Sequence, residues 1–374
     1  MGDIDIVKED KNLFCFILAG GEGSRLKNLT KDTCKPLVKV CCVYHLIDFT
    51  LINCLRSGII DMAIIVQYES IDLIKYLYKS NMNSLMRNFY VLPPEIKKSH
   101  KEYIGYKDTA HSVYVNKNFI DDSIDDILIL SADHIYSMDY TKFHNHHIEN
   151  DNDLTISVLN VPIEDASRYG VFTVDEEDNI LDFEEKPENP KSSIASMGIY
   201  IFKKELLFNV LDELYKIKGP NLDFGRDVIP YYLKHHKVGI YKFKWYWIDL
   251  GTLNSFWKLN MGFLDNTDEI QKFFHFDERF KISTDASNLY PAILGSHSNI
   301  RCSLMGKNSY VDGELFHSMV GDNCRIDKNT TIIRSVIMDN CHIKEGVTIV
   351  NAVISQNTIV EEDVVSNGED IICI

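Results

Sequence analysis

The segment from Leu18 to Pro36 combines closely spaced glycines with cationic side chains, which suits it to bind phosphate groups. Glycines let the backbone approach a phosphate and turn its N–H groups toward it. Arg25 can donate two parallel hydrogen bonds to phosphate oxygens, and Lys35 adds a point charge ten residues later. The glycine spacing matches neither a Walker loop nor a dinucleotide-binding fingerprint. We therefore predict a phosphate-binding loop whose backbone positions include Leu18, Ala19, Gly20, Gly21 and Gly23.

Two aspartates are candidates for holding a divalent cation. Asp133 follows a short apolar run, and Asp249 lies in the segment Trp247–Thr252. Because Mg²⁺ prefers one or two carboxylates together with substrate phosphates, a carboxylate at Asp133 can hold Mg²⁺, with Asp249 as a second candidate. The alternative for either residue is an ordinary turn or helix N-cap aspartate.

A group of three histidines, in contrast, does not resemble a metal site. Its spacing does not place all three side chains on one face of a helix, so we predict a solvated helix face. These histidines are His144, His146 and His147.

The elements that would position these groups alternate between apolar runs and helical patterns. The alternation predicts an α/β fold with a mostly parallel mixed sheet flanked by helices. Ligands of such sheets bind outside the carboxyl ends of the strands, where Gly20, Gln67 and Asp133 all fall. The strand-like runs are Leu13–Leu18, Met62–Gln67, Ile127–Leu130 and Leu154–Val161, and the helical patterns are Tyr44–Gly58 and Ile71–Leu77.

The C-terminal part changes character and becomes repetitive. Residues 320–336 and 337–353 form two 17-residue blocks that share an Asp-Asn-Cys run, at Asp322–Cys324 and Asp339–Cys341. Such repeats stack into a parallel β-helix, here of about four coils, in which the cysteines form one rung and not a metal site. We therefore predict a first domain over 1–264, a linker with one short helix over 265–291, and a β-helix domain over 292–374.

Composition excludes several classes of partner. The net charge of −16 argues against nucleic acid, because phosphate backbones are bound by basic surfaces. The sequence has neither an apolar run long enough to span a membrane nor the apolar core of a signal peptide. Its nine cysteines lack zinc or disulfide spacing, so we expect reduced thiols in the cytoplasm.

Several runs resemble the sugar-1-phosphate nucleotidyltransferases, and among them the bacterial glucose-1-phosphate adenylyltransferases. The resemblance covers almost the whole chain and implies a Rossmann-like nucleotidyltransferase fold followed by a left-handed parallel β-helix. It implies that ATP and glucose 1-phosphate react to give ADP-glucose and pyrophosphate, for glycogen synthesis. The runs are GGEGSRLKNLTKDTCKP (Gly20–Pro36), IDFTLINCLRSGI (Ile47–Ile59), SADHIYSMDY (Ser131–Tyr140), ASRYGVF (Ala166–Phe172), FEEKP (Phe183–Pro187), SMGIYIF (Ser196–Phe202) and DLGTLNSFWKLNM (Asp249–Met261).

The resemblance also assigns residues to sites. It implies that Arg25, Lys35 and Asp133 are catalytic and that Asp133 and Asp249 bind the metal. The nucleotide would contact Leu18, Ala19, Gly20, Gly21, Gly23, Gln67 and Thr109. The sugar phosphate would contact Tyr106, Gly170, Glu185, Lys186 and Ser196. It further implies a homotetramer or a hetero-oligomer with a paralogous subunit, assembled partly through the β-helix.

The chain departs from the family pattern at three places, one of which is the stretch Glu69–Tyr106, which is shorter than in the family and lacks the expected Trp before Tyr106. Cys41-Cys42 replaces a glycine pair, and His45 replaces an arginine. Because glycines supply backbone angles that a Cβ disfavours, we expect this loop to differ in conformation. Asp108 replaces a glycine near the nucleotide base.

These departures leave three alternatives. The chain could be a regulatory subunit with weak or no catalysis, or a nucleotidyltransferase that uses another base or sugar, such as guanosine and mannose. The third is a β-helix acyltransferase or assembly module.

Overall fold

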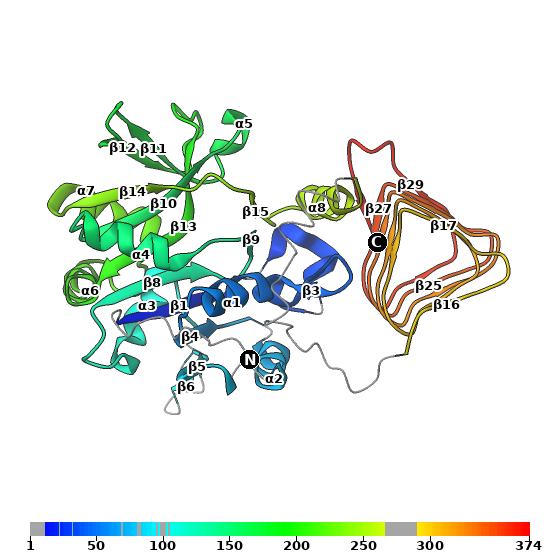
Figure 1. The fold of residues 1–374 in the computed structure, drawn as a ribbon, viewed down its shortest axis with the longest axis horizontal. Helices are drawn as coiled ribbons and strands as arrows, with labels where there is room; N and C mark the ends of the chain where they lie inside the picture. The colour runs from blue at the N-terminus through cyan, green and yellow to red at the C-terminus, as the bar shows by residue number, and fades with distance from the viewer. Residues whose placement is uncertain are drawn as a thin grey trace, which may run out of the picture.

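The computed structural model describes residues 12–21, 23–31, 33–68, 70–80, 84–94, 96–97, 102–103, 105–265 and 290–374. It consists of an α/β domain followed by a β-helix (Figure 1). The linker helix that we predict between the two domains falls within residues 266–289, which lie outside the described residues.

Four parallel strands form the half of the main sheet that contains the predicted phosphate-binding loop. They are hydrogen-bonded in the order β8-β1-β4-β5. Helices cover both faces of these strands, which explains why the sequence shows unbroken apolar runs. The predicted strands at Leu13, Met62 and Ile127 are confirmed. The bounds are β1 (Leu13–Ala19), β4 (Asp61–Val66), β5 (Asn88–Leu92) and β8 (Asp126–Ser131).

The other half of the sheet is largely antiparallel. Here β13 pairs antiparallel with β8, β10 and β11, and β11 pairs antiparallel with β12. The predicted strand at Leu154 is β10, which runs parallel only to β14. The sheet is thus mixed, as predicted. The bounds are β10 (Leu154–Asn160), β11 (Gly170–Val174), β12 (Ile180–Glu185), β13 (Ile194–Lys203) and β14 (Val238–Lys242).

Helices pack on both faces of the sheet through two apolar cores. One core joins α1, α2 and α4 to the face of β1 that carries Cys15 and Ile17. The other joins α3, α6 and α7 to the face that carries Phe14 and Phe16. The bounds are α1 (Leu46–Arg56), α2 (Ser70–Lys79), α3 (Thr109–Val115), α4 (Tyr140–Glu149), α5 (Ile163–Ala166), α6 (Lys204–Lys218) and α7 (Ile229–His235).

The histidines of α4 do not form a solvated face, so that prediction is wrong. His144 and His147 are each 2% exposed, and both face Asp126 on β8, with His144 Nε2 2.6 Å from Asp126 Oδ2. His146 is separate from them and bonds to the Ile240 carbonyl. The prediction failed because the neighbour that makes burial possible, Asp126, is distant from the histidines in sequence. Burial opposes the Asp126 charge, but the hydrogen bond with His144 and the nearby His147 outweigh it and lower the pKa of Asp126 to about 2.

This buried cluster predicts a loss of stability in acid. Because the pKa of Asp126 is depressed in the folded state, its contribution is complete above the ordinary pKa near 4 and is lost as the pH falls toward 2. The expected contribution is about 2 kcal/mol, at about 1.4 kcal/mol per pKa unit. Urea unfolding of wild type and Asp126→Asn at pH 7 and pH 2.5 measures it. The stability difference should shrink in acid, whereas the exposed Asp122→Asn control should follow wild type. A constant difference would contradict the prediction.

The C-terminal domain is the predicted left-handed β-helix, with three parallel sheets of five strands each and therefore one coil more than predicted. The 17-residue repeat is confirmed by the strand register, in which Thr331 pairs with Thr348 and Val336 with Val353. Cys324 and Cys341 are buried in one rung, and their thiols donate to the carbonyls of Met338 and Ser355.

The fifteen strands fall into three columns. The first contains β16 (Ile293–Leu294), β19 (Tyr310–Val311), β22 (Arg325–Ile326), β25 (His342–Ile343) and β28 (Ile359–Val360). The second contains β17 (Asn299–Arg301), β20 (Glu314–Phe316), β23 (Thr331–Ile333), β26 (Thr348–Val350) and β29 (Val364–Val365). The third contains β18 (Leu304–Met305), β21 (Met319–Val320), β24 (Val336–Ile337), β27 (Ala352–Ile354) and β30 (Ile372–Cys373).

One corner of the β-helix is turned by a column of asparagines. Asn308, Asn323, Asn340 and Asn357 all have φ between 57° and 64°. Asparagine tolerates this left-handed conformation better than most residues. Each side-chain amide donates to the next in the column, at 2.8 to 3.1 Å. The asparagine that recurs in the repeats therefore has a structural role.

A short hairpin, β2 (Lys39–Val40) and β3 (Tyr44–His45), carries the Cys41-Cys42 departure. Cys41 and Cys42 have φ of 53° and 60°, and the Val43 N–H donates to the Val40 carbonyl. Positive φ at both central positions is typical of the tight turns that glycine favours. The hairpin therefore has glycine-type backbone angles at two residues that carry a Cβ.

The two domains share an apolar core. It combines Val38 and Val40 near the hairpin, Phe256 and Trp257 of α8 (Leu253–Asp265), and a column of the β-helix that begins at Met319. Figure 1 shows α8 lying between the α/β domain and the β-helix.

Candidate active site

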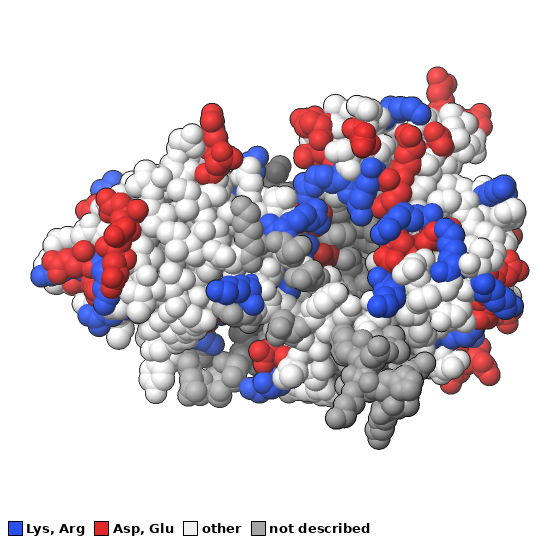
Figure 2. All heavy atoms as spheres, turned by 180° about the vertical axis from the view of Figure 1, so that it is seen from behind, with Lys and Arg blue, Asp and Glu red and all other residues white. Residues whose placement is uncertain are grey.

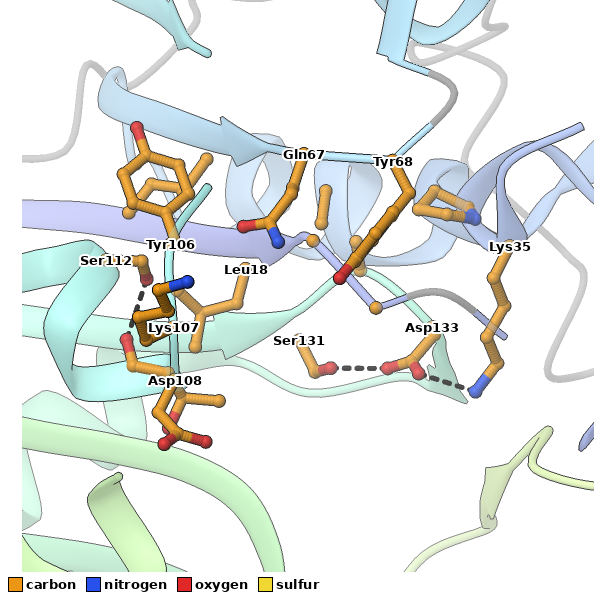
Figure 3. Close-up of a pocket in the computed structure, with 17 residues that line it drawn as sticks. Leu18, Lys35, Gln67, Tyr68, Tyr106, Lys107, Asp108, Ser112, Ser131 and Asp133 are labelled. Carbon is orange, nitrogen blue, oxygen red and sulfur yellow. Dashed lines mark hydrogen bonds and ion pairs between the residues drawn. The ribbon is translucent and has the colours of Figure 1, made fainter. Parts of the chain in front are cut away.

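A cavity of about 450 Å³ lies at the carboxyl ends of β1, β4 and β8. It brings together Gly20, Gln67 and Asp133, as the strand-end argument predicts. In Figure 3, Lys35 and Asp133 lie at one end of the cavity and Tyr106, Lys107 and Asp108 at the other. The predicted site residues among its lining are Leu18, Ala19, Gly20, Gly21, Lys35, Gln67, Tyr106, Thr109 and Asp133.

Gly23 shapes the phosphate-binding loop. Its φ is 70°, and a Cβ there would lie 3.0 Å from both the Lys35 Cβ and the Thr30 Cγ2. The Thr30 hydroxyl donates to the Gly23 carbonyl at 3.0 Å, across the 3₁₀ turn η1 (Ser24–Thr30). A second turn, η2 (Lys35–Leu37), starts at Lys35. Glycine is thus required where the loop packs against Lys35.

Lys35 is the centre of a charged cluster. Its Nζ lies 2.5 Å from Asp133 Oδ2 and 3.6 Å from Asp249 Oδ1. Asp249 reaches this position because β15 (Trp247–Asp249) pairs antiparallel with β9 (His134–Tyr136), which places Asp249 opposite His134. Burial opposes the charge of Asp133, but Lys35, His134 and the Ser131 hydroxyl outweigh it and hold the pKa of Asp133 well below its usual range.

The cluster also provides ligands that fit a divalent cation. Ligand atoms of Asp133, His134 and Asp249 lie within 4.8 Å of one another. The two carboxylates are the kind of ligand that Mg²⁺ prefers, whereas imidazole suits transition metals better. Without a metal, the ammonium of Lys35 compensates the two carboxylates. The two predicted metal ligands are therefore adjacent, as a magnesium site requires.

Arg25 lies at the edge of this cluster, beside an arginine that sequence reasoning missed. A Cβ on Gly251 would lie 3.3 Å from Arg25 Nη2 and 3.0 Å from Arg168 Nη2. Arg168 Nη2 is also 3.3 Å from Asp249 Oδ2, and Arg168 Nε is buried with no hydrogen-bond partner among the described residues. The run ASRYGVF, which resembles the family, includes Arg168, but the resemblance assigns only Gly170 from this run to a site.

Replacing Arg168 by alanine should lower kcat by about 10- to 100-fold, the usual effect of removing a residue that orients a metal ligand. The loss follows because Asp249 would lose the guanidinium beside its Oδ2 and would keep Lys35, 3.6 Å from its Oδ1. Steady-state pyrophosphate release measures it, with Arg325→Ala on the outer face of the β-helix as the control. Wild-type kcat in Arg168→Ala would rule out this role.

The residues predicted to bind the sugar phosphate lie mostly on β11, β12 and β13. Gly170 pairs with Glu185, and a Cβ at Gly170 would lie 2.8 Å from Glu185 Oε2. The Glu185 carboxylate also lies against Gly225, and burial raises its pKa. Lys186 has φ of 49° and donates its backbone N–H to the Tyr169 carbonyl. Glycines thus make room for Glu185 while the backbone of Lys186 is fixed beside it.

Ser196, another predicted sugar-phosphate residue, lies on a strand that passes beside the charged cluster. It lies on β13, which pairs with β8 through Tyr200 opposite Ile129, four residues before Asp133. Nearby on the same strand, a Cβ at Gly198 would lie 3.5 Å from His134 Cε1. The segments that carry Gly170 and Ser196 therefore adjoin the charged cluster, through Arg168 and Gly198.

Tyr106 is placed differently from the other predicted sugar-phosphate residues. It lines the cavity end that also contains Gln67 and Thr109, and its hydroxyl donates to the Pro93 carbonyl at 3.1 Å. Thr109 Oγ1 donates to Asp223 Oδ2 at 2.9 Å and accepts from the Phe224 N–H. Tyr106 thus belongs spatially with the residues predicted to bind the nucleotide.

Asp108, which replaces a family glycine, turns away from Gln67 in Figure 3. Its carboxylate lies 3.6 Å from Arg226. Burial and the neighbouring Asp223 raise the pKa of Asp108, while Arg226 opposes that change. Asp108 therefore sits at the rim of the cavity, facing a cation of the protein.

The surface charge agrees with a site for phosphates. Figure 2 shows Lys and Arg side chains gathered around a hollow on the α/β domain, although the chain carries a net charge of −16. On an acidic protein, binding of phosphates requires such a local concentration of cations.

Comparison with known families agrees with both parts of the fold. The nucleotidyl transferase family matches residues 15–266, and the GlmU-like, C-terminal hexapeptide family matches residues 289–371. The first match spans the glycine loop, Lys35, Asp133 and Asp249. The fold and the site therefore define an enzyme of the nucleotidyltransferase class.

Comparison with individual relatives identifies a family within this class. The chain is 40% identical over 333 residues to the glucose-1-phosphate adenylyltransferase of Fusobacterium nucleatum, with 88% of this chain and 86% of the relative covered. It is 39% identical to the enzymes of the same name from Mycoplasma mobile and Bacillus subtilis, with 86% of this chain covered in both, and 84% and 85% of the relatives. The chain belongs to the glucose-1-phosphate adenylyltransferase family.

Within the described part of the chain, no helix has both the length and the apolar character needed to span a membrane.

Proposed function

We propose that this protein transfers the adenylyl group of ATP to glucose 1-phosphate, giving ADP-glucose and pyrophosphate for glycogen synthesis. The observation that carries the proposal is the cluster of Lys35, Asp133 and Asp249 at the mouth of the strand-end cavity. Membership of the glucose-1-phosphate adenylyltransferase family supports the choice of substrates.

The reaction would be an in-line displacement at phosphorus. A phosphate oxygen of glucose 1-phosphate attacks the α-phosphorus of ATP, and pyrophosphate leaves. Such a transfer needs little covalent chemistry from the protein, so its rate depends on positioning and on neutralisation of charge. Arg25 and Lys35 would neutralise phosphate oxygens, while Glu185 and Lys186 would hold the sugar hydroxyls and the sugar phosphate.

Mg²⁺ is the cation that we propose for Asp133 and Asp249. Bound there, it would polarise phosphate oxygens and compensate their negative charge. The side chains of Asp133 and Asp249 would hold it, with Lys35 moving from the carboxylates to the phosphates.

The far end of the cavity would receive the adenine base. Gln67 points into the cavity in Figure 3, from the carboxyl end of β4, and Tyr106 lies across from it. Of Gln67 and Asp108, we expect Gln67 to bind the base. Asp108 is in ion contact with Arg226 at the rim of the cavity, whereas the Gln67 amide can both donate and accept hydrogen bonds.

Turnover with each of the four common NTPs tests the proposal. Purified protein is incubated with Mg²⁺, glucose 1-phosphate and one NTP at a time, and pyrophosphate release is followed. We expect release with ATP and little with the other three. Release with GTP alone, or release that does not depend on glucose 1-phosphate, would contradict the proposed substrates.

We further propose that the protein works in the cytoplasm as a homotetramer or as a hetero-oligomer with a paralogous subunit. Support comes from the end coils of the β-helix, where apolar side chains are left exposed. They are Ile293 and Leu294 on β16 and Ile359 on β28, each more than half exposed. Sedimentation velocity of the purified chain separates a tetramer from a monomer.

A further inference from the structure

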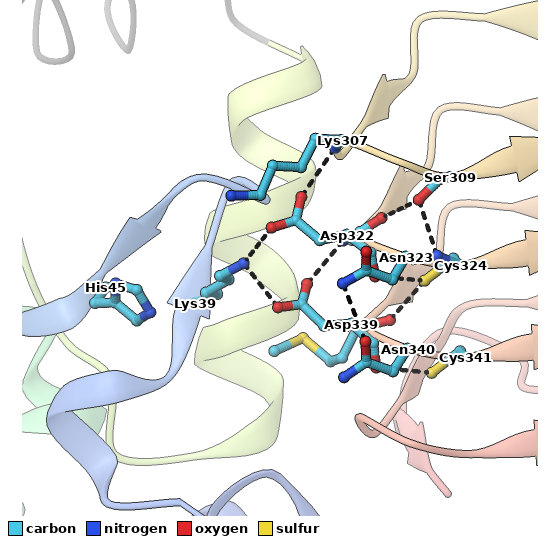
Figure 4. Close-up of polar contacts among 12 residues, drawn as sticks. Lys39, His45, Lys307, Ser309, Asp322, Asn323, Cys324, Asp339, Asn340 and Cys341 are labelled. Atoms are coloured by element: carbon cyan, nitrogen blue, oxygen red, sulfur yellow. Dashed lines mark hydrogen bonds and ion pairs between the residues drawn. The ribbon is translucent and has the colours of Figure 1, made fainter. Parts of the chain in front are cut away.

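Lys39 connects the α/β domain to the β-helix through two ion pairs. Its Nζ lies 2.7 Å from Asp322 Oδ2 and 2.7 Å from Asp339 Oδ2, and Figure 4 shows it between the two carboxylates. The acceptors come from neighbouring coils. The Asp322 N–H donates to Asp339 Oδ1 at 2.8 Å, and the Lys307 N–H donates to Asp322 Oδ1 at 2.9 Å. Backbone hydrogen bonds therefore fix both carboxylates before Lys39 reaches them.

This contact differs from an ordinary surface ion pair. The side chains of Lys39, Asp322 and Asp339 are only 18%, 12% and 22% exposed. Burial opposes the charge of Lys39, yet the carboxylates of Asp339 and Asp322 outweigh burial and raise the pKa of Lys39. Exposed ion pairs contribute little, whereas removal of one member of a buried group leaves an uncompensated charge. The geometry is therefore that of a fixed interdomain contact.

The contact lies close in sequence to the charged cluster. Lys39 is four residues after Lys35, and the Val38 N–H between them donates to the Lys35 carbonyl at 3.0 Å. Val38 and Val40 are buried in the core that the two domains share. A displacement of Lys39 would thus be transmitted to Lys35 through a short and tightly packed segment.

The side of the charged cluster that Asp249 provides is also attached to the β-helix. Asp249 is followed by α8, whose Trp257 Nε1 donates to the Arg334 carbonyl of the β-helix at 2.7 Å. The Cys41 N–H of the hairpin donates to Asn260 Oδ1 of α8 at 2.8 Å. The segments that carry Lys35 and Asp249 are therefore joined to each other and to the same domain.

We propose that Lys39 is a positioning residue, and that its clamp between Asp322 and Asp339 lets the β-helix hold Lys35 in register with Asp133 and Asp249. The proposal rests on the proposed function, because turnover is its principal readout. It gives the β-helix a direct role in the catalytic geometry, in addition to assembly.

Steady-state kinetics of the full-length Lys39→Met variant test the clamp. We expect kcat to fall on the order of tenfold to a hundredfold, because a small misplacement of a group that acts in the transition state costs that much. The KM for ATP should change little, since Lys39 lies outside the cavity. The matched control is Lys328→Met, which removes an exposed ion pair with Glu345 on the β-helix and should retain wild-type kcat.

A double-mutant cycle separates the clamp from a general loss of stability. If Lys39 acts through the two aspartates, then adding Asp322→Asn and Asp339→Asn to Lys39→Met should cause no further fall in kcat. Independent, multiplying losses would overturn the proposal, as would wild-type kcat in Lys39→Met. If Lys39→Met does not fold, Asp339→Asn alone, which keeps the shape of the side chain, takes its place.

Amide hydrogen exchange tests the clamp without turnover. The N–H groups of Leu37 and Val38 are hydrogen-bonded in η2, and they should exchange faster in Lys39→Met than in wild type. Unchanged exchange would overturn the proposal even if the wild-type protein proved inactive. Absence of pyrophosphate release from wild type with every NTP would instead count against the proposed function. The two failures are therefore distinguishable.

Discussion

Asp133→Asn should lower turnover on the order of 10²- to 10³-fold, by analogy with the removal of a preorganised charged or polar group from other active sites. The substitution keeps the shape of the side chain but removes one of the two carboxylates available to Mg²⁺. It also leaves Lys35 with Asp249 as its ion-pair partner, at 3.6 Å. A carboxylate ligand for Mg²⁺ and the close ion pair with Lys35 would therefore be lost together.

Pyrophosphate release as a function of Mg²⁺ concentration measures this loss. The variant should require more Mg²⁺ and should not regain wild-type kcat at saturation. Asp139→Asn is the matched control, because Asp139 is an N-cap of α4 that accepts from the Thr141 N–H and lies outside the cluster. Wild-type turnover of Asp133→Asn at ordinary Mg²⁺ would remove Asp133 from the mechanism.

Arg25→Ala should also lower kcat on the order of 10²- to 10³-fold. Arg25 lies at the open edge of the cluster, with its guanidinium near Gly251, and its side chain is exposed. A guanidinium there can hold two phosphate oxygens in fixed directions, which a water molecule cannot replace.

The matched control for Arg25 is Lys31→Ala, which removes an exposed cation just after η1 in the same loop. It should leave kcat close to wild type. If both variants lost activity equally, the effect would come from the overall charge of the loop. An undiminished kcat in Arg25→Ala would refute its assignment as a catalytic residue.

Much of the site could be predicted because its signals are local or lie at strand ends. Gly20, Gln67 and Asp133 could be brought together from the sequence alone, since parallel strands carry their carboxyl ends to one edge. The β-helix could be predicted for a similar reason. Its coils repeat in sequence, so Asp322 and Asp339 are recognisably equivalent without knowledge of the fold.

What could not be predicted depends on contacts between distant segments. The burial of His144 requires Asp126 on another element, and the role of Arg168 requires Asp249, which lies 81 residues away. Lys39 and Asp322 are 283 residues apart. The backbone angles of the Cys41-Cys42 turn could not be predicted for another reason. A Cβ makes left-handed angles unfavourable but does not forbid them, and the surrounding core of Val40 and Leu46 holds the turn in place.

The repetition of the β-helix raises a problem of alignment that the clamp at Lys39 solves. Neighbouring coils lie roughly 4.8 Å apart and offer similar apolar side chains, so the α/β domain could slide by one coil and find nearly the same surface. The acidic pair does not repeat in this way. One coil before Asp322 the corresponding residue is Lys307, and one coil after Asp339 it is Gln356. A slip in either direction would replace a carboxylate by a cation or a neutral amide, so Lys39 selects a single alignment of the two domains.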